Sequence, residues 1–120
     1  SEEELIAGGF GENYSVDVIW GNDEGLAGAE KITANVTVNS NMSDDKNMVL
    51  VMELFDEDNN IVGMDAIRLT ASGNDTTCSE EALEISNLSG VTDEYKLKIF
   101  IWDSVVSMKT LKDAIVYGEN

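Results

Sequence analysis

The sequence predicts an all-β protein, an antiparallel β-sandwich of about seven short strands. Apolar and polar residues alternate along several segments, which is the period of a strand with one buried side. Turns rich in Gly, Asn and Asp separate these segments at intervals of about eight to fifteen residues, as in β-sandwiches. The chain of 120 residues has the length of one domain.

The first two strands are predicted over residues 14–20 and 31–40. In the first strand one side of the extended chain carries Tyr14, Val16, Val18 and Trp20. In the second the corresponding side carries Ile32, Ala34, Val36 and Val38. Each pattern indicates a strand with one face turned to a core.

The next two strands are predicted as a hairpin. Residues 48–55 are apolar on both sides except at Glu53, which is typical of a central strand that is covered on both faces. Residues 56–60 have the composition of a turn, and residues 61–70 form the returning strand.

The last third of the chain contains one ambiguous segment and two strands. In residues 76–86, Thr77 and Glu80 fit a helix capping box, whereas Leu83 and Ile85 alternate as in a strand, and we favour the strand. Residues 95–103 form a core strand with Leu97, Ile99 and Ile101 on one face and Lys96, Lys98, Phe100 and Trp102 on the other. The β-branched residues near position 115 favour a closing strand over a helix.

The predicted domain organisation is a short linker followed by one module. Residues 1–13 are acidic and rich in glycine, so we expect a flexible linker there. Residues 14–120 form the β-sandwich module.

Composition excludes several classes of function. Lys and Arg number 7 against 24 Asp and Glu, a net charge of −17, so nucleic acid is not an expected partner. The longest apolar run, Met48 to Met52, is far too short for a membrane span, and we expect no membrane insertion. The chain has no His and one Cys, which removes imidazole bases and cysteine clusters. We therefore expect no enzyme activity and no cofactor.

Two short motifs carry a resemblance to a known group of modules. The first is Met52-Glu53-Leu54-Phe55-Asp56 with the turn after it, and the second is Phe100-Ile101-Trp102-Asp103-Ser104 followed by Met108-Lys109-Thr110-Leu111. Residues 31–117 resemble the immunoglobulin- or fibronectin-like β-sandwich of secreted clostridial and ruminococcal polysaccharide-degrading enzymes and surface-layer proteins. Phe55 stands where that group has Tyr, and Thr110 where it has Pro. The resemblance implies an immunoglobulin-like fold and a non-catalytic accessory role in a secreted or cell-surface bacterial protein.

Aromatic side chains supply two candidate platforms for a sugar, since flat rings stack on the apolar face of a pyranose. The first candidate is Trp20 with Tyr14 and Phe10, for which ordinary burial of Trp20 is the alternative. The second is Phe55, Phe100 and Trp102, which share the outward face if their two strands are neighbours. Its alternative is that residues 105–111 fold back over the rings.

The acidic turn gives a weak calcium signal. Asp56, Asp58 and Asn60 alternate as in the opening of a calcium loop, but Ile61 and Ile67 occupy the places of the required Gly and Glu. We interpret this segment as a solvated turn and assign no metal site.

The expected function is a non-catalytic accessory module that binds carbohydrate through surface aromatics, with a polysaccharide and neighbouring domains of the parent chain as partners. The alternative is a spacer without ligand, or a module for inter-domain or cell-surface interaction.

Overall fold

The computed structural model describes residues 14–40, 43–71, 78–102 and 110–118, and these residues form only strands and their connections. The all-β prediction is confirmed. The strands are β1 (Tyr14–Trp20), β2 (Ile32–Ser40), β3 (Lys46–Phe55), β4 (Ile61–Ala71), β5 (Cys78–Ile85), β6 (Lys96–Trp102) and β7 (Thr110–Val116).

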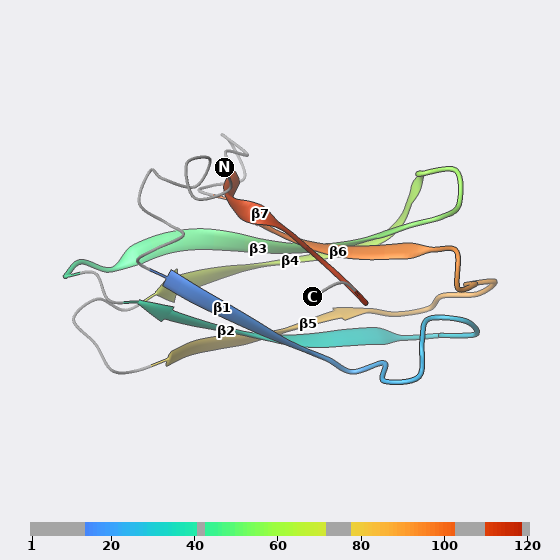
Figure 1. Ribbon diagram of the computed structural model, residues 1–120, viewed down its shortest axis with the longest axis horizontal. Coiled ribbons are helices and arrows are strands. Elements are labelled where there is room, and N and C mark those ends of the chain that lie inside the picture. The colour runs from blue at the N-terminus through green and yellow to red at the C-terminus, as the bar shows by residue number, and fades with distance from the viewer. Residues whose placement is uncertain (1–13, 41–42, 72–77, 103–109, 119–120) are drawn as a thin grey trace.

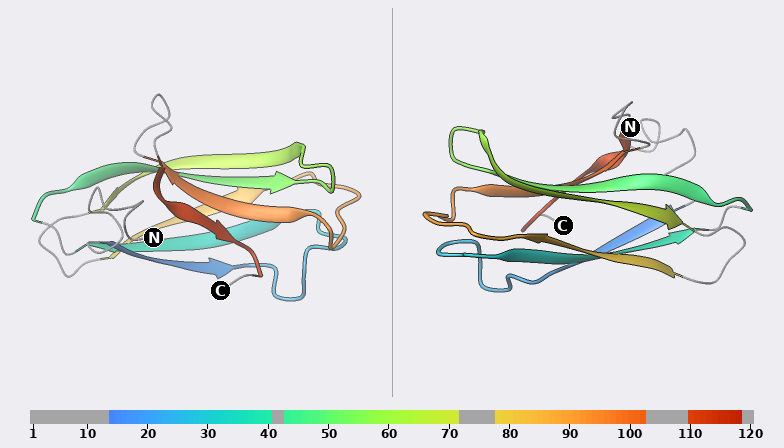
Figure 2. Two further views of the ribbon diagram at one scale, coloured as in Figure 1. Left: turned by 45° about the horizontal axis from the view of Figure 1, so that its top comes forward. Right: turned by 180° about the vertical axis from the view of Figure 1, so that it is seen from behind.

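The strands form two antiparallel sheets that lie one over the other (Figure 1). One sheet has the order β1-β2-β5 and the other the order β4-β3-β6-β7. Figure 2 shows the same two layers from two further directions. This is an immunoglobulin-like sandwich in which the fourth strand joins the sheet of the third. The described residues contain no helix that could span a membrane.

The core lies between the sheets and is built from the alternating positions of each strand. In β6 the burial alternates as the sequence pattern predicts, with Leu97, Ile99 and Ile101 inward. From the opposite sheet, the inward residues of β2 and β5 complete the same apolar cluster. Burial of apolar surface of this kind is the main driving force that holds the two layers together.

Strand β3 is buried on both of its faces. Met48, Leu50, Met52 and Leu54 point into the core, and the residues between them are buried on the outer side. β3 lies between β4 and β6, so side chains from both neighbours flank its outer side. The prediction of a central strand covered on both faces is confirmed.

The two uncertain segments are both strands. β5 pairs with β2, and the register sets Leu83 opposite Ala34 and Ile85 opposite Ile32. These inward pairs bury apolar surface that a helical turn would leave exposed, so the capping-box residues do not determine the conformation. β7 pairs with β6 and begins at Thr110, earlier than the β-branched residues alone predict.

The turn between β3 and β4 has the predicted hairpin character. Asn59 adopts φ = 66°, a left-handed conformation that Asn tolerates better than most residues. Asp56 holds the turn, because its carboxylate accepts the backbone N–H groups of Asp58 and Asn60, both at 2.9 Å.

Candidate functional site

The outward side of the four-stranded sheet carries the second predicted platform. We use the name outer face for the outward residues of β3, β4 and β6. They are Val49, Val51, Glu53 and Phe55 of β3, Met64, Ala66 and Arg68 of β4, and Lys96, Lys98, Phe100 and Trp102 of β6.

The rings of Phe100 and Trp102 form a pair on this face. Their centroids are 6.1 Å apart and their planes are tilted by 35°. Both side chains are partly exposed, so solvent reaches a surface made of two neighbouring rings. The predicted alternative, in which residues 105–111 fold back over the rings, concerns side chains that all lie outside the described part of the chain.

A packed apolar layer lies beside this ring pair. Val51 is opposite Phe100, and Val49 is opposite Trp102. Val51 is 0% exposed although it points away from the sandwich core. Because directly opposite side chains on neighbouring strands lie about 5 Å apart, the register places each ring beside a buried valine.

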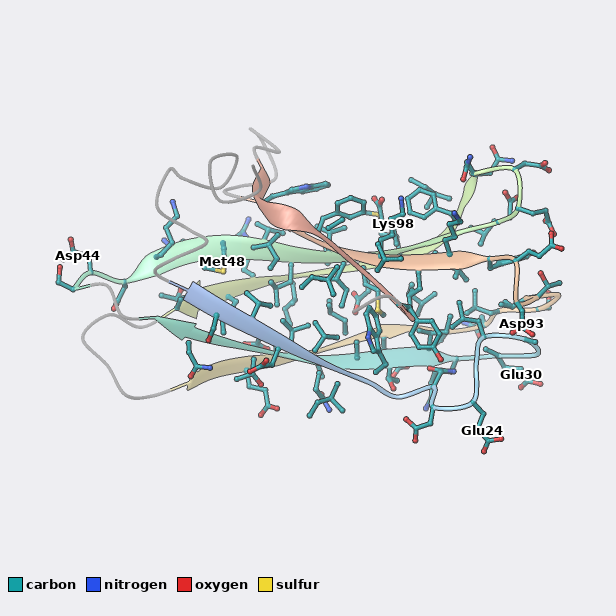
Figure 3. All side chains as sticks on the ribbon, in the orientation of Figure 1. Glu24, Glu30, Asp44, Met48, Asp93 and Lys98 are labelled. Carbon is teal, nitrogen blue, oxygen red and sulfur yellow. The ribbon has the colours of Figure 1, made fainter. Side chains whose placement is uncertain are left out.

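Phe55 lies on the same face but at its other end. Its partner in the register is Lys96, which precedes Trp102 by six residues on β6. Phe55 therefore lies about 20 Å from Trp102 along the strand direction. The Lys98 ammonium lies 5.3 Å from the centroid of the Phe55 ring, in a cation–π contact. Figure 3 shows Lys98 on the side of β6 that is turned away from the three-stranded sheet. The structure therefore brings Phe100 and Trp102 together and leaves Phe55 apart from them.

Glu53 is a buried carboxyl group on this face, with 9% of its surface exposed. It lies between Met64 and Lys98, its opposite residues on the two neighbouring strands. Burial raises the pKa of the Glu53 carboxyl above its ordinary value of 4.5, and the Lys98 ammonium offsets part of that rise. The sequence shows Glu53 as the single break in an apolar strand, but its burial follows from the register of three strands.

Trp20, from the first predicted platform, lies at the end of β1 and packs against the core. Its ring meets the ring of Tyr117 edge to face, with centroids 5.3 Å apart and planes at 88°. The Tyr117 hydroxyl donates to the backbone carbonyl of Asn22, directly after β1. The pair thus joins the first strand of one sheet to the end of the last strand of the other.

Tyr117 was not predicted as a partner of Trp20. The signal that points to it is topological, because β1 and β7 occupy edges of different sheets that the sandwich stacks together (Figure 2). The sequence pattern does not predict this contact, because Trp20 and Tyr117 lie far apart along the chain.

An open depression of about 450 Å³ adjoins this ring pair. Its lining comes from the ends of β1 and β7 and from the turn after β1, namely Val18, Ile19, Trp20, Asn22, Asp23, Tyr117 and Gly118. The Asn22 amide is engaged in the turn itself, where it donates to the Lys31 carbonyl and accepts from the Thr33 N–H.

For the other members of the first platform, the structure describes only the backbone position of Tyr14. Tyr14 begins β1, six residues from Trp20, so their backbones are about 20 Å apart. The side chain of Tyr14, and Phe10 as a whole, lie outside the described residues.

The acidic turn brings three carboxylates close together. Asp56, Glu57 and Asp58 each have an oxygen within 4.8 Å of the others, a spacing that a calcium ion could bridge. The pKa of Asp56 is lowered, chiefly because Asn60 donates its backbone N–H to the carboxylate. These backbone hydrogen bonds account for the position of Asp56 without a metal.

Comparison with known proteins supports the fold and no closer assignment. No family model matches the sequence, and no curated protein matches it. Among solved structures, a β-glucuronidase from glycoside hydrolase family 2 matches 85% of this chain with a TM-score of 0.54 and 18% identity. A calcium-binding mutant of β-glucuronidase 2 from Bacteroides uniformis matches 84% with a TM-score of 0.51 and 12% identity.

A glycosyl hydrolase family 2 member from Bacteroides cellulosilyticus also matches 84% of this chain, with a TM-score of 0.50 and 17% identity. This chain spans only 10%, 12% and 13% of those three proteins. At these identities the likeness is one of fold: the chain has the β-sandwich architecture of a small part of much longer glycosidases.

Proposed function

We propose that this chain is a non-catalytic accessory domain of a secreted or cell-surface bacterial protein that acts on polysaccharides, and that it binds a glycan on the outer face. One finding supports the accessory role: the fold is similar to about a tenth of longer family 2 glycosidases.

The observation that carries the binding proposal is the partly exposed Phe100–Trp102 pair. Rings two residues apart on one strand present their surfaces on the same side of the sheet. A sugar can stack its apolar face on such rings while its hydroxyl groups remain in water or meet nearby polar side chains. Each ring lies opposite a buried valine, and a side chain that its neighbours already restrict loses less conformational entropy on binding.

A platform of this kind gives modest affinity for a single sugar chain. The benefit to the parent protein would come from tethering, because one bound module raises the effective concentration of its neighbours at an insoluble polymer. No cleft or catalytic group is needed for that role.

The Trp20–Tyr117 pair is assigned a structural role in this proposal. Both rings pack against the core, and Tyr117 is further held by its hydrogen bond to Asn22. The adjoining depression would therefore have to bind a sugar against residues already engaged in joining the two sheets.

Affinity electrophoresis against a panel of plant polysaccharides tests the proposal. Wild-type protein should be retarded by at least one polysaccharide. Trp102→Ala should weaken that retardation by about tenfold or more, since loss of a central aromatic contact commonly costs over 1.4 kcal/mol. Phe100→Leu, which keeps an apolar side chain but removes the flat ring, is a milder second variant.

The matched control is Ile19→Ala, because Ile19 is 66% exposed and lies in the other sheet. It should migrate as wild type in every gel. Circular dichroism establishes that each variant is folded. Unchanged migration of the wild type in all gels would support the alternative, a spacer or inter-domain brace without a glycan ligand.

Fluorescence gives a direct local readout, because the chain has only two tryptophans. In a Trp20→Phe variant the remaining emission comes from Trp102. Iodide should quench it in the free protein, and a bound glycan should protect it. Retardation in a gel without any protection of Trp102 would place the binding site elsewhere.

A further inference from the structure

Positive charge is unevenly distributed between the two sheets. The strands of the three-stranded sheet contain no Lys or Arg at all. Among the residues that the structure describes, each Lys or Arg within a strand belongs to the four-stranded sheet, and these are Lys46, Arg68, Lys96, Lys98 and Lys112. In a chain with net charge −17, this places most of the few cations on one layer.

Three of these cations lie on the outer face with the aromatic rings. Arg68 and Lys96 are exposed, and Lys98 is partly exposed. The acid described on the outer face is Glu53, which is buried and has a raised pKa. The outward side chains of the three-stranded sheet instead include Asp17, Glu80 and Glu84.

The register sets Arg68 and Lys98 near the ring pair, while Lys96 lies farther along β6. Arg68 and Trp102 lie on opposite sides of Val49, about 10 Å apart across two strand spacings. Lys98 precedes Phe100 by two residues on β6, a separation of about 7 Å. Arg and Lys side chains are long enough to reach a group carried by a sugar that stacks on the rings.

We infer that the outer face takes an acidic glycan, with its sugar rings on Phe100 and Trp102 and its carboxylate or sulfate groups beside Arg68 and Lys98. The acidic groups of the next sugars along the glycan would lie beside Lys96, about 13 Å from Phe100 along β6. This inference rests on the proposed function and names its ligand class. A neutral glycan requires only the rings and hydrogen-bonding groups. An anionic glycan would be repelled by most of the surface of this acidic protein. The cations of the outer face would permit its approach and orient it.

The test compares pairs of glycans that share a backbone and differ in whether that backbone carries negative charge. Polygalacturonate and its fully methyl-esterified form share a backbone, and dextran sulfate with dextran gives the corresponding pair for sulfate. Wild-type protein should bind the charged member of at least one pair about fivefold or more tightly than the neutral member. The difference should shrink as NaCl rises from about 20 to 300 mM, because salt screens exposed charges.

Charge-removing variants locate the effect on the protein. The double variant Lys96→Gln and Arg68→Gln removes two exposed cations and leaves the rings in place. It should lose about three- to tenfold in affinity for the acidic glycan, as expected for exposed charge contacts, with little change for a neutral one. The matched control Lys31→Gln removes an exposed cation beside the other sheet and should change either affinity by less than about twofold.

The outcomes separate this inference from the proposed function. Equal binding of charged and neutral members, still lost in Trp102→Ala, would overturn the acidic ligand and leave glycan binding intact. Retardation by no polysaccharide would overturn both. Binding of polyglutamate as strong as that of the acidic glycan would also overturn the inference, because charge alone would then explain the affinity.

Discussion

Ile99 illustrates how single inward residues support the sandwich. It is 0% exposed and lies at the centre of β6, between the two sheets. Ile99→Ala should lower the free energy of unfolding by about 2 to 5 kcal/mol, because it leaves a cavity that the packed layers cannot fill. Equilibrium denaturation in urea measures the loss.

The control for this prediction is Ile19→Ala, the same substitution at a residue that is 66% exposed. Its effect should stay within about 0.5 kcal/mol. Similar losses in the two variants would contradict the assignment of inward and outward positions.

Glu53 gives a pH-dependent prediction at the same scale. Its pKa is raised in the folded state, so the folded protein binds the proton more tightly than the unfolded chain does. Its contribution to stability is therefore greatest below the ordinary pKa of 4.5 and is lost as the pH rises through the raised value. Glu53→Gln should remove this dependence, so the variant gains stability relative to wild type from about pH 4 to pH 7.

Denaturation of both proteins across that pH range measures the difference, and the other acids cancel because both chains carry them. A difference that is flat with pH, or that moves in favour of wild type, would show that the Lys98 ammonium outweighs burial at this position.

At the residue scale, the sequence predicts faces better than contacts. Alternation alone places Ile99 inward and Phe100 and Trp102 outward, and the structure agrees. It does not predict that Glu53 is buried, because that burial depends on Met64 and Lys98, which adjoin it only through strand pairing.

At the scale of elements, the link between β1 and β7 connects the two sheets at an edge. It consists of the Trp20–Tyr117 ring pair and the hydrogen bond from Tyr117 to Asn22. Tyr117→Phe keeps the ring and removes the hydroxyl, so it should destabilise the fold by about 0.5 to 1.5 kcal/mol. Thermal or urea denaturation tests this value, and Tyr117→Ala should cost more because the ring contact is lost as well.

Phe100→Leu is the comparison for the stability change in Tyr117→Phe. Phe100 is also an aromatic residue, but it lies outside the core cluster, on the outer face. It should affect glycan binding more than stability. A Tyr117→Phe variant as stable as wild type would mean that the hydroxyl makes no net contribution to joining the strands.

The elements differ in how well local sequence predicts them. β2 and β6 alternate clearly and agree closely with prediction. β5 and β7 were ambiguous because their sequences also fit helical turns, and only pairing with β2 and β6 settles them. The sequence does not predict that β4 and β5 lie close together. In the structure Gly63 permits this approach, because a Cβ there would lie 2.6 Å from a methyl carbon of Ile85.

At the scale of the whole molecule, the net charge of −17 on a body of 45 × 27 × 27 Å opposes folding through self-repulsion. Raising NaCl from about 10 to 150 mM shortens the Debye length from about 30 to 8 Å. The thermal midpoint should therefore rise by several degrees, which corresponds to about 1 kcal/mol in a domain of this size. A midpoint that is constant or falls with NaCl would contradict this account.

The fold gathers aromatic rings and positive charges on the outer face. Sandwich topology determines which strands share a sheet, and that pairing gathers rings from β6 and cations from β4 and β6 on one side. Composition alone gives the total charge of the chain, which is strongly negative. Only the three-dimensional arrangement shows that cations gather on one surface.

Amide chemical-shift mapping by NMR tests the central claim most directly. Titration of the labelled protein with an acidic oligosaccharide should shift the amides of residues 49–55 and 96–102 and leave those of β1, β2 and β5 unchanged. Shifts confined to Trp20, Asp23 and Tyr117, or none at saturating ligand, would contradict a binding face on the four-stranded sheet.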